Sequence, residues 1–357
     1  MTGTAVTDFA PHPNAPRISA PRPARMEPFV PAAHGSDRPL PAKATYEFGG
    51  RLPDLLRRPV FGALARVNDF VFRSAPPGDP VERTPGSWSF AAIGDYGSGS
   101  LAQAQVAQRI LTDEPDLVVT LGDNIYWTGH ERNWQRRWDP EHFFGGIRRE
   151  IPVMPSLGNH DIAGGGADAY FRRFPELAGA RYYSYQKQNV HFTVLDSNES
   201  LAPDSPQYRW FQREVASAPA DAWKVVYFHH PMYSGYTARD GRLAESLGPI
   251  LAKTGVDLVL TGHDHSYERT VPLNDHGTIH VLAGAGGHTV YPYLFRQPEW
   301  SAYRATDYGY LNVEVTDDRL VGRYRLRNGE TLDTFVIERA ARQAIEDAAL
   351  GAGQATQ

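Results

Sequence analysis

The sequence predicts a mixed α/β (α+β) fold in which two β-sheets pack as a sandwich and helices flank them. From Trp88 onward, apolar runs of strand length alternate with amphipathic patterns of helix length, as βα units require. After Gly262, further strand-like runs follow one another without helices between them, which indicates antiparallel pairing. Several apolar runs end in Asp, Asn or His, so the carboxyl edge of the sheets is expected to carry the functional site.

Composition narrows the possible functions. The 357 residues suffice for one large α/β domain with extensions, or for two small domains. The net charge of -5 and the lack of a Lys/Arg run argue against a nucleic-acid binding surface. They do not argue against a phosphorylated substrate, because a metal site supplies its own positive charge. With no cysteine, disulfides, iron–sulfur clusters, thiolate zinc sites and a cysteine nucleophile are excluded.

The N-terminal part precedes the expected domain. Residues 1–43 are rich in Pro and Ala without hydrophobic periodicity, which predicts a disordered arm. Residues 44–87 are expected to form an amphipathic helix over 54–73 and then a Pro-rich linker. That helix either docks onto the domain or makes peripheral membrane contact. Neither a secretory signal nor a membrane-spanning run is visible, which favours a cytoplasmic location.

Residues 88–339 are expected to form the catalytic domain, and 340–357 a short helix and tail. Strands are expected at 89–94, 116–122, 153–157, 181–186, 190–196, 224–229, 256–262, 278–283, 310–315, 320–326 and 334–338. Helices are expected at 101–112, within 131–150, and at 167–174, 207–216 and 243–254. The strands at 181–186 and 190–196 are predicted to pair antiparallel.

Five short motifs carry side chains that bind metals. They are Ile93-Gly94-Asp95, Leu121-Gly122-Asp123-Asn124-Ile125-Tyr126, Leu157-Gly158-Asn159-His160, Phe228-His229-His230 and Thr261-Gly262-His263-Asp264-His265. Each motif alone reads as an ordinary turn or loop, and His229-His230 alone as a core histidine pair. Their repetition at successive strand ends is hard to explain except as a metal centre.

The donor types indicate which metals fit. Carboxylate, phenolate, amide and imidazole donors come from Asp95, Asp123, Tyr126, Asn159, His229, His263 and His265. A hard trivalent metal prefers anionic oxygen donors, whereas imidazole suits divalent iron, zinc or manganese. Two adjacent metals need a shared anionic ligand, and Asp123 at the central strand end is the expected bridge. Phosphoester hydrolysis is the chemistry that such a two-metal site fits best.

The five motifs in this order resemble the signature of the calcineurin-like metallophosphoesterases. More narrowly, the sequence is similar to the purple acid phosphatase branch. The wider superfamily begins with Asp-x-His, whereas Gly97 stands in the place of that histidine here, and Tyr126 follows Asp123 by three residues. Tyr267-Glu268-Arg269 and the segment 283–287 also look like this family.

The resemblance implies a two-sheet sandwich flanked by helices, the αββα metallophosphoesterase fold, and two metal ions. Ferric iron is expected on Asp95, Asp123, Tyr126 and His265. Ferrous iron, zinc or manganese is expected on Asp123, Asn159, His229 and His263. His160 is expected to bind a phosphate oxygen or to protonate the leaving group, with Asn159 and His230 also near the substrate.

The expected function is hydrolysis of phosphate monoesters by attack of a metal-bound hydroxide, with Asp123 and His160 as the catalytic residues. A phosphodiesterase acting on nucleotide or lipid diesters is the first alternative. A non-catalytic metal-binding scaffold is the second, and the complete ligand set argues against it.

The segment 287–309 is expected to be a loop that shapes the substrate pocket. Aromatic residues crowd it, together with His288 and Arg304, which are candidates for substrate binding. Such a loop either holds the organic group of a phosphorylated small molecule or lipid, or packs on the surface with solvated arginines.

Overall fold

The computed structural model describes residues 79–236 and 242–339, which belong to one compact unit of the chain. The predictions for the arm 1–43, the helix 54–73 and the tail 340–357 lie outside these residues. None of the helices within the described ranges combines the length and hydrophobicity that a membrane crossing requires.

The first sheet combines parallel and antiparallel strands. Its order is β13 (Thr331–Glu338), β12 (Arg319–Leu326), β11 (Gly309–Val315), β1 (Trp88–Ile93), β2 (Leu117–Leu121) and β3 (Val153–Ser156). β1, β2 and β3 run parallel, whereas β11, β12 and β13 are joined antiparallel. All residues of β1 and β2 are buried, as expected for near-continuous apolar strands covered on both faces.

The second sheet also combines parallel and antiparallel strands. Its order is β10 (Ser301–Ala305), β8 (Tyr267–Thr270), β9 (Ile279–Ala283), β7 (Leu258–Thr261), β6 (Trp223–Tyr227), β5 (Val190–Val194) and β4 (Tyr183–Lys187). β5, β6, β7 and β9 are parallel, and the predicted antiparallel pair β4–β5 is confirmed. Parallel strands bring their carboxyl ends to one edge, so residues that follow β6 and β7 become neighbours.

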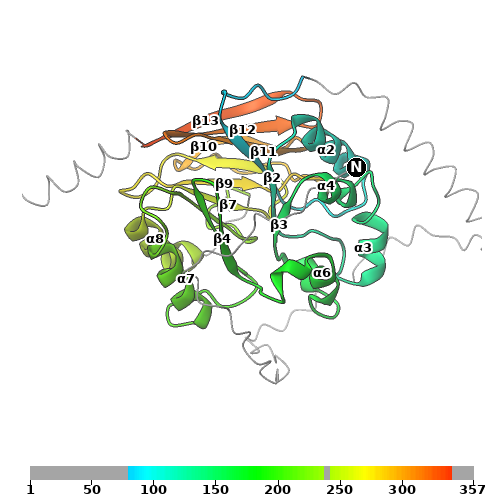
Figure 1. Ribbon diagram of the computed structural model, residues 1–357, viewed down its shortest axis with the longest axis horizontal. Coiled ribbons are helices and arrows are strands. Elements are labelled where there is room, and N and C mark those ends of the chain that lie inside the picture. Colours follow the sequence, from blue (N-terminus) through cyan, green and yellow to red (C-terminus); the bar gives the residue numbers. More distant parts are fainter. Residues whose placement is uncertain (1–78, 237–241, 340–357) are drawn as a thin grey trace, which may run out of the picture. The chain divides into compact units, whose positions relative to one another are not determined.

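Helices lie outside the two sheets. They are α2 (Leu101–Asp113), α3 (Glu131–Arg137), α4 (Phe144–Glu150), α5 (Asn159–Ile162), α6 (Asp168–Arg173), α7 (Pro206–Ala216), α8 (Arg242–Thr254) and the 3-10 helix η1 (Pro175–Leu177). Figure 1 shows α7 and α8 side by side next to one part of the strands, and α2, α3, α4 and α6 next to another.

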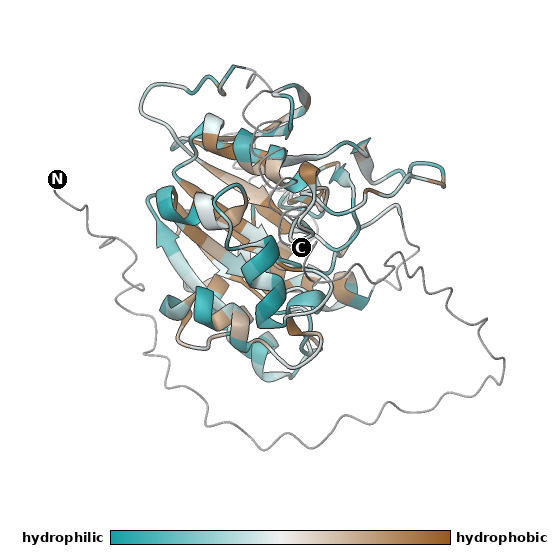
Figure 2. Cartoon of the chain, turned by 90° about the vertical axis from the view of Figure 1, so that its right-hand side faces the viewer, coloured by the Kyte–Doolittle hydropathy of each residue, from teal (hydrophilic) through white to brown (hydrophobic). Residues whose placement is uncertain are grey.

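The core lies between the sheets. Phe90 of β1 and Phe192 of β5 are fully buried, and their rings meet edge to face with centroids 5.3 Å apart. Tyr267 of β8 stacks on Tyr324 of β12 with ring centroids 4.0 Å apart, so the two sheets also pack against each other through β8 and β12. In Figure 2 the hydrophobic residues concentrate on the strands, while the outer surfaces of the helices are hydrophilic. The predicted sandwich flanked by helices is therefore confirmed.

The helix boundaries follow local chemistry. Ser100 caps α2 by accepting a hydrogen bond from the backbone N–H of Gln103. Ser205 caps α7 in the same way, and Pro206 occupies the first helical position, where its missing N–H costs nothing.

Two expectations about elements were wrong. The region 131–150 is not helical throughout, because residues 138–143 form turns between α3 and α4, and Pro140 among them cannot continue a helix. The segment 287–309 is not all loop, since it contains β10, which pairs antiparallel with β8. β8 itself and the single-turn helix α5 were also not expected.

Candidate metal centre

Strand ends from both sheets meet at the centre. Asp95 follows β1, Asp123 and Tyr126 follow β2, and Asn159 begins α5 just after β3. From the second sheet, His229 follows β6, and His263 and His265 follow β7. The seven predicted ligands thus come from five strand ends, and all of them converge on one place in the fold.

The backbone at these strand ends is turned sharply. Asp95, Asp123 and His263 adopt left-handed conformations, with φ of 57°, 50° and 77°. Such values are uncommon for residues other than glycine, and they cluster at functional sites where surrounding structure holds them. Gly122 also has a positive φ of 84°, and a Cβ on it would come within 2.6 Å of His229 Nδ1. The glycine before Asp123 therefore lets the two sheets approach closely.

Two groups of donor atoms, that is, atoms able to donate an electron pair to a metal, lie at this place. The first group surrounds the hydroxyl of Tyr126. Its Oη lies 3.0 Å from Asp95 Oδ1, 2.9 Å from Asp123 Oδ2 and 3.0 Å from His265 Nε2. His265 Nε2 lies 3.4 Å from Asp95 Oδ1. Four donor atoms therefore face one small volume.

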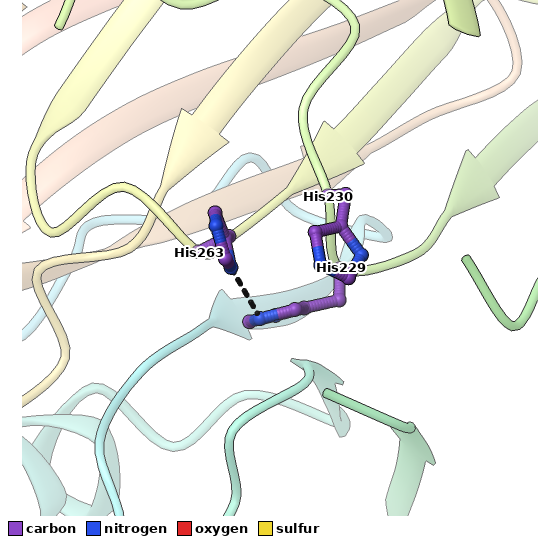
Figure 3. Close-up of side chains that lie close together, drawn as sticks. All are labelled: His229, His230 and His263. Carbon is purple, nitrogen blue, oxygen red and sulfur yellow. Dashed lines mark hydrogen bonds between the residues drawn. The ribbon is translucent and has the colours of Figure 1, made fainter. Parts of the chain in front are cut away.

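The second group surrounds the amide oxygen of Asn159. Asn159 Oδ1 lies 3.0 Å from both His229 Nε2 and His263 Nδ1, and these two nitrogens are 3.1 Å apart. Figure 3 shows the rings of His229 and His263 turned toward each other, with His230 beside them. The other carboxylate oxygen of Asp123, Oδ1, lies 3.5 Å from His229 Nε2. Asp123 thus faces one donor group with each of its two oxygens.

These distances fit cations. Ligand atoms about 2.1 Å from an octahedral metal lie about 3 Å from one another, close to the spacing within both groups. The donor types in the second group also indicate a bound cation. An amide oxygen and the unprotonated nitrogens of neutral imidazoles all carry lone pairs, which repel at 3.0 Å unless a cation or a proton lies between them.

Backbone carbonyls orient two of the histidines. His229 Nδ1 donates to the carbonyl oxygen of Leu121 at 2.9 Å, and His265 Nδ1 donates to that of Thr289 at 2.7 Å. A carbonyl oxygen only accepts, so Nδ1 carries a hydrogen in both rings, and in the neutral imidazole Nε2 then faces the donor groups with its lone pair. This outer hydrogen bond is typical of metal-binding histidines.

The electrostatics of the buried groups also favour cations. Burial opposes the charge of His229, yet the carboxylates of Asp123 and Asp95 raise the pKa of this imidazole above its usual value. Burial alone would raise the pKa of Asp95, but its hydrogen bond with His265 and the neighbouring histidines lower it to about 2. Burial and the negative charges of Asp95 and Asp123 raise the pKa of the Tyr126 phenol well above 10. Only a strongly acidic cation would ionise that phenol near neutral pH.

Three of the residues predicted to bind the substrate are histidines close to the two groups of donor atoms. His160 lies at the rim, where its Nε2 is 4.0 Å from Asp123 Oδ2 and its backbone N–H donates to Asp123 Oδ1. His230 packs against His263 with ring centroids 4.5 Å apart and hydrogen-bonds Ser197 through Nδ1. The ring of His288 lies over Tyr126 at 4.1 Å. All three histidines are therefore near the donor groups.

Arg304 is placed differently. Its Nε donates to Glu268 at 2.9 Å, and its guanidinium lies over the ring of Tyr293. Glu268 of β8 also accepts from the backbone N–H of Gly235, so the pair joins the neighbouring strands β8 and β10 to the loop that carries Gly235. A role for Arg304 in substrate binding stays a prediction, and its contacts are those of a residue that fixes β10 against its neighbours.

Two buried residues of the centre were not singled out from the sequence. Asp161 accepts hydrogen bonds from the backbone N–H groups of Gly158 and Ile125, at 2.7 and 3.2 Å. Asn124 donates to Asp161 at 2.8 Å and accepts from Tyr96 at 2.7 Å. Together they fix the segment that carries Asp123 and Tyr126 relative to the one that carries Asn159. Asn124 lies within the second motif and Asp161 directly follows the third, and only these positions mark them.

Comparison with known protein families gives two matches. Residues 89–267 match the calcineurin-like phosphoesterase family, and residues 277–334 match the iron/zinc purple acid phosphatase-like C-terminal domain. The first match contains all five motifs.

Curated relatives include purple acid phosphatases of Arabidopsis thaliana. Purple acid phosphatase 15 is 28% identical over 63% of this chain and 49% of its own length. Another, called probable inactive purple acid phosphatase 1, is 25% identical over 85% of this chain and 57% of its own length. The chain therefore spans about half the length of these relatives.

The fold has counterparts among solved structures. A purple acid phosphatase from yellow lupin seeds superposes with a TM-score of 0.59 at 22% identity, over 73% of this chain and 55% of that one. This likeness concerns the fold, and it agrees with the two-sheet arrangement described above.

Proposed function

Since the chain belongs to the calcineurin-like phosphoesterase family and to its purple acid phosphatase branch, we propose that it hydrolyses phosphate monoesters at a two-metal centre. One observation carries the proposal. The two oxygens of Asp123 face separate groups of donor atoms, which is the placement that a carboxylate shared by two cations requires.

Two cations held there would supply Lewis-acid chemistry, polarising the phosphoryl oxygens and lowering the pKa of water. The protein's own part is to hold the donors in place before the substrate arrives. Left-handed turns at Asp95 and Asp123, backbone hydrogen bonds to the histidines, and burial together fix the donor positions. The reaction then requires little reorganisation of the site.

We assign ferric iron to the group around Tyr126 and ferrous iron, zinc or manganese to the group around Asn159. The assignment follows from the donors. The first group has two carboxylates, a phenol and one imidazole, which suits a hard trivalent ion, whereas the second has two imidazoles, an amide and one carboxylate oxygen.

His160 is proposed to act on the substrate itself. Its Nδ1 hydrogen-bonds the carbonyl oxygen of Trp127 at 2.7 Å, so Nδ1 carries a hydrogen and Nε2 is the nitrogen left for the substrate. Its side chain keeps 28% of its surface exposed, unlike the buried Asp123 below it. That position suits a group that binds a phosphate oxygen or passes a proton to the leaving group. His230, at the rim of the other donor group, is proposed to face the same phosphate.

Two other functions compete with this proposal. A phosphodiesterase would use the same centre, and a second ester group would then have to fit beside it. A non-catalytic scaffold is the other alternative, because at least one relative bears the name of a probable inactive enzyme. The presence of all seven donors within the two groups supports catalysis over the scaffold.

A metal-removal experiment tests the proposal. The purified protein would be stripped with a chelator, reloaded with iron alone or with iron plus zinc or manganese, and offered a panel of phosphate mono- and diesters. We expect hydrolysis only after reloading, with monoesters cleaved faster than diesters. Faster cleavage of diesters would favour the phosphodiesterase, whereas metal binding without hydrolysis of any ester would favour the scaffold.

A further inference from the structure

One exposed aromatic ring stands at the rim of the metal centre. Trp127 directly follows the proposed ligand Tyr126, and 60% of its surface is accessible. Other large hydrophobic residues exposed in the described part of the chain, such as Leu294 and Phe295, do not adjoin a proposed ligand in sequence. A tryptophan left open to water next to a reactive centre is a candidate for binding a ligand.

Three aromatic rings at the metal centre contact the ring of Trp127. It meets Tyr126 edge to face with centroids 5.8 Å apart, His288 at 4.8 Å and His160 at 6.1 Å. These contacts fix the ring at the rim and leave much of its surface in water. The backbone of the same residue also positions His160, through the hydrogen bond from Nδ1 to the Trp127 carbonyl oxygen.

We propose that Trp127 binds the aromatic part of the substrate, so that the centre prefers aryl phosphate monoesters to alkyl ones. This inference rests on the proposed phosphomonoesterase function. A monoester has a single organic group, which is also its leaving group. The side chain that lies beside His160, where the leaving group is expected, is therefore the one that the organic group meets.

The size of the preference follows from aromatic packing. An aromatic group that packs against an indole gains an interaction beyond simple burial, which corresponds to about a 2- to 12-fold difference in binding. A short alkyl group cannot make this contact. The preference is therefore expected to reside in the Trp127 side chain, while the backbone hydrogen bond to His160 is independent of it.

The first test compares two substrates in two variants. Trp127→Leu keeps an apolar side chain and the backbone carbonyl but removes the ring. We expect kcat/KM for phenyl phosphate to fall about 2- to 12-fold, and that for butyl phosphate to change less than twofold. Because each variant is compared with the wild type on the same ester, the different reactivities of the two leaving groups cancel. Trp127→Phe, which keeps a ring, should retain most of the preference.

Val336→Ala is the control. It removes exposed apolar surface from a side chain on β13, 46% accessible, which lies outside both the metal centre and the segment 287–309. Both substrates should be hydrolysed by this variant as by the wild type. An equal loss for phenyl and butyl phosphate in Trp127→Leu, or no loss for either, would overturn the inference while leaving phosphoester hydrolysis intact.

A binding measurement separates this inference from the proposed function. Titration calorimetry on the metal-loaded protein would compare phenylphosphonate with methylphosphonate, neither of which is an ester. We expect tighter binding of phenylphosphonate in the wild type and a smaller difference in Trp127→Leu. If no ester were hydrolysed, the proposed function would fail, and this calorimetric comparison alone would then decide the role of Trp127.

Discussion

Tyr126 is the residue whose chemistry depends most on what binds beside it. Its hydroxyl lies within 3.0 Å of two carboxylate oxygens and one imidazole nitrogen, in a buried site. As a phenol it can donate to one of these neighbours only. Burial and the two carboxylates raise its pKa, so ionisation requires a cation that outweighs both effects. Ferric iron is acidic enough, whereas zinc and manganese are much weaker acids.

The Tyr126→Phe variant tests this assignment by colour. A phenolate bound to ferric iron absorbs visible light, so the oxidised, iron-loaded wild type should be purple. Tyr126→Phe removes the phenol oxygen and should bleach the protein while some iron remains on Asp95, Asp123 and His265. Visible absorption and iron analysis on the same samples would check this.

The Tyr291→Phe variant is the control for colour. Tyr291 stacks on the proposed ligand His265 with ring centroids 4.3 Å apart, but its hydroxyl is not among the proposed metal-binding atoms of the centre. Its substitution should leave the absorption band in place. If the oxidised, iron-loaded wild type is colourless, Tyr126 is not a ligand, and a zinc or manganese pair beside an un-ionised tyrosine becomes the better description.

At the scale of elements, most of the fold could be predicted because the strands carry strong local signals. β1, β2, β6 and β7 are apolar runs of fitting length, and each is followed by a ligand type. β10 gave no comparable signal. It is a partly exposed strand at the sheet edge, and its conformation depends on pairing with β8, which is distant in sequence.

β9 carries a buried histidine that the mechanism does not use. His280 is buried, its ring lies 4.8 Å from that of Tyr233, and its Nδ1 lacks a hydrogen-bond partner among the described residues. Burial lowers the pKa of this imidazole to about 3. A histidine in the unfolded chain has a pKa of about 6.5. Between these two values, only the unfolded chain binds the proton.

His280 is therefore expected to weaken the fold in acid. Stability falls with falling pH wherever the unfolded state binds more protons, by up to about 1.4 kcal/mol per pH unit for one group. The His280→Phe variant cannot bind this proton and keeps the ring contact with Tyr233. Between about pH 7 and about pH 5, its free energy of unfolding should drop by about 2 kcal/mol less than that of the wild type.

Urea unfolding at about pH 7 and about pH 5 would measure this difference. Metal release in acid affects both proteins alike and cancels in the comparison. The same pH dependence in wild type and His280→Phe would mean that His280 is protonated in the folded protein, contrary to its burial.

At the scale of the whole molecule, the centre joins the two sheets. Four proposed ligands come from the first sheet and three from the second: Asp95, Asp123, Tyr126 and Asn159, and His229, His263 and His265. The convergence of all seven proposed ligands could be predicted because each lies at or just after a recognisable strand end. The carbonyls of Leu121 and Thr289, which orient two histidines, could not be, since any residue type supplies a carbonyl and only the tertiary fold brings it there.

The side chain proposed to bind the aromatic part of the substrate could not be predicted from the sequence either. Aromatic residues crowd 287–309, but the exposed ring at the rim belongs to Trp127, far from that segment in the chain. Exposure and contact between distant segments are properties of the folded chain. A residue that directly follows a buried ligand would be expected from sequence to be buried as well.

Metal content of the wild type and of Asp123→Ala, measured by elemental analysis, tests the central claim most directly. Asp123 faces both donor groups, so its removal should cost both sites their metal, whereas Asp168→Ala at an exposed position should not. We predict two metal ions per chain in the wild type and in Asp168→Ala, and nearly none in a folded Asp123→Ala. Retention of both metals by Asp123→Ala, or hydrolysis by a wild type that holds at most one metal, would contradict the shared-carboxylate centre.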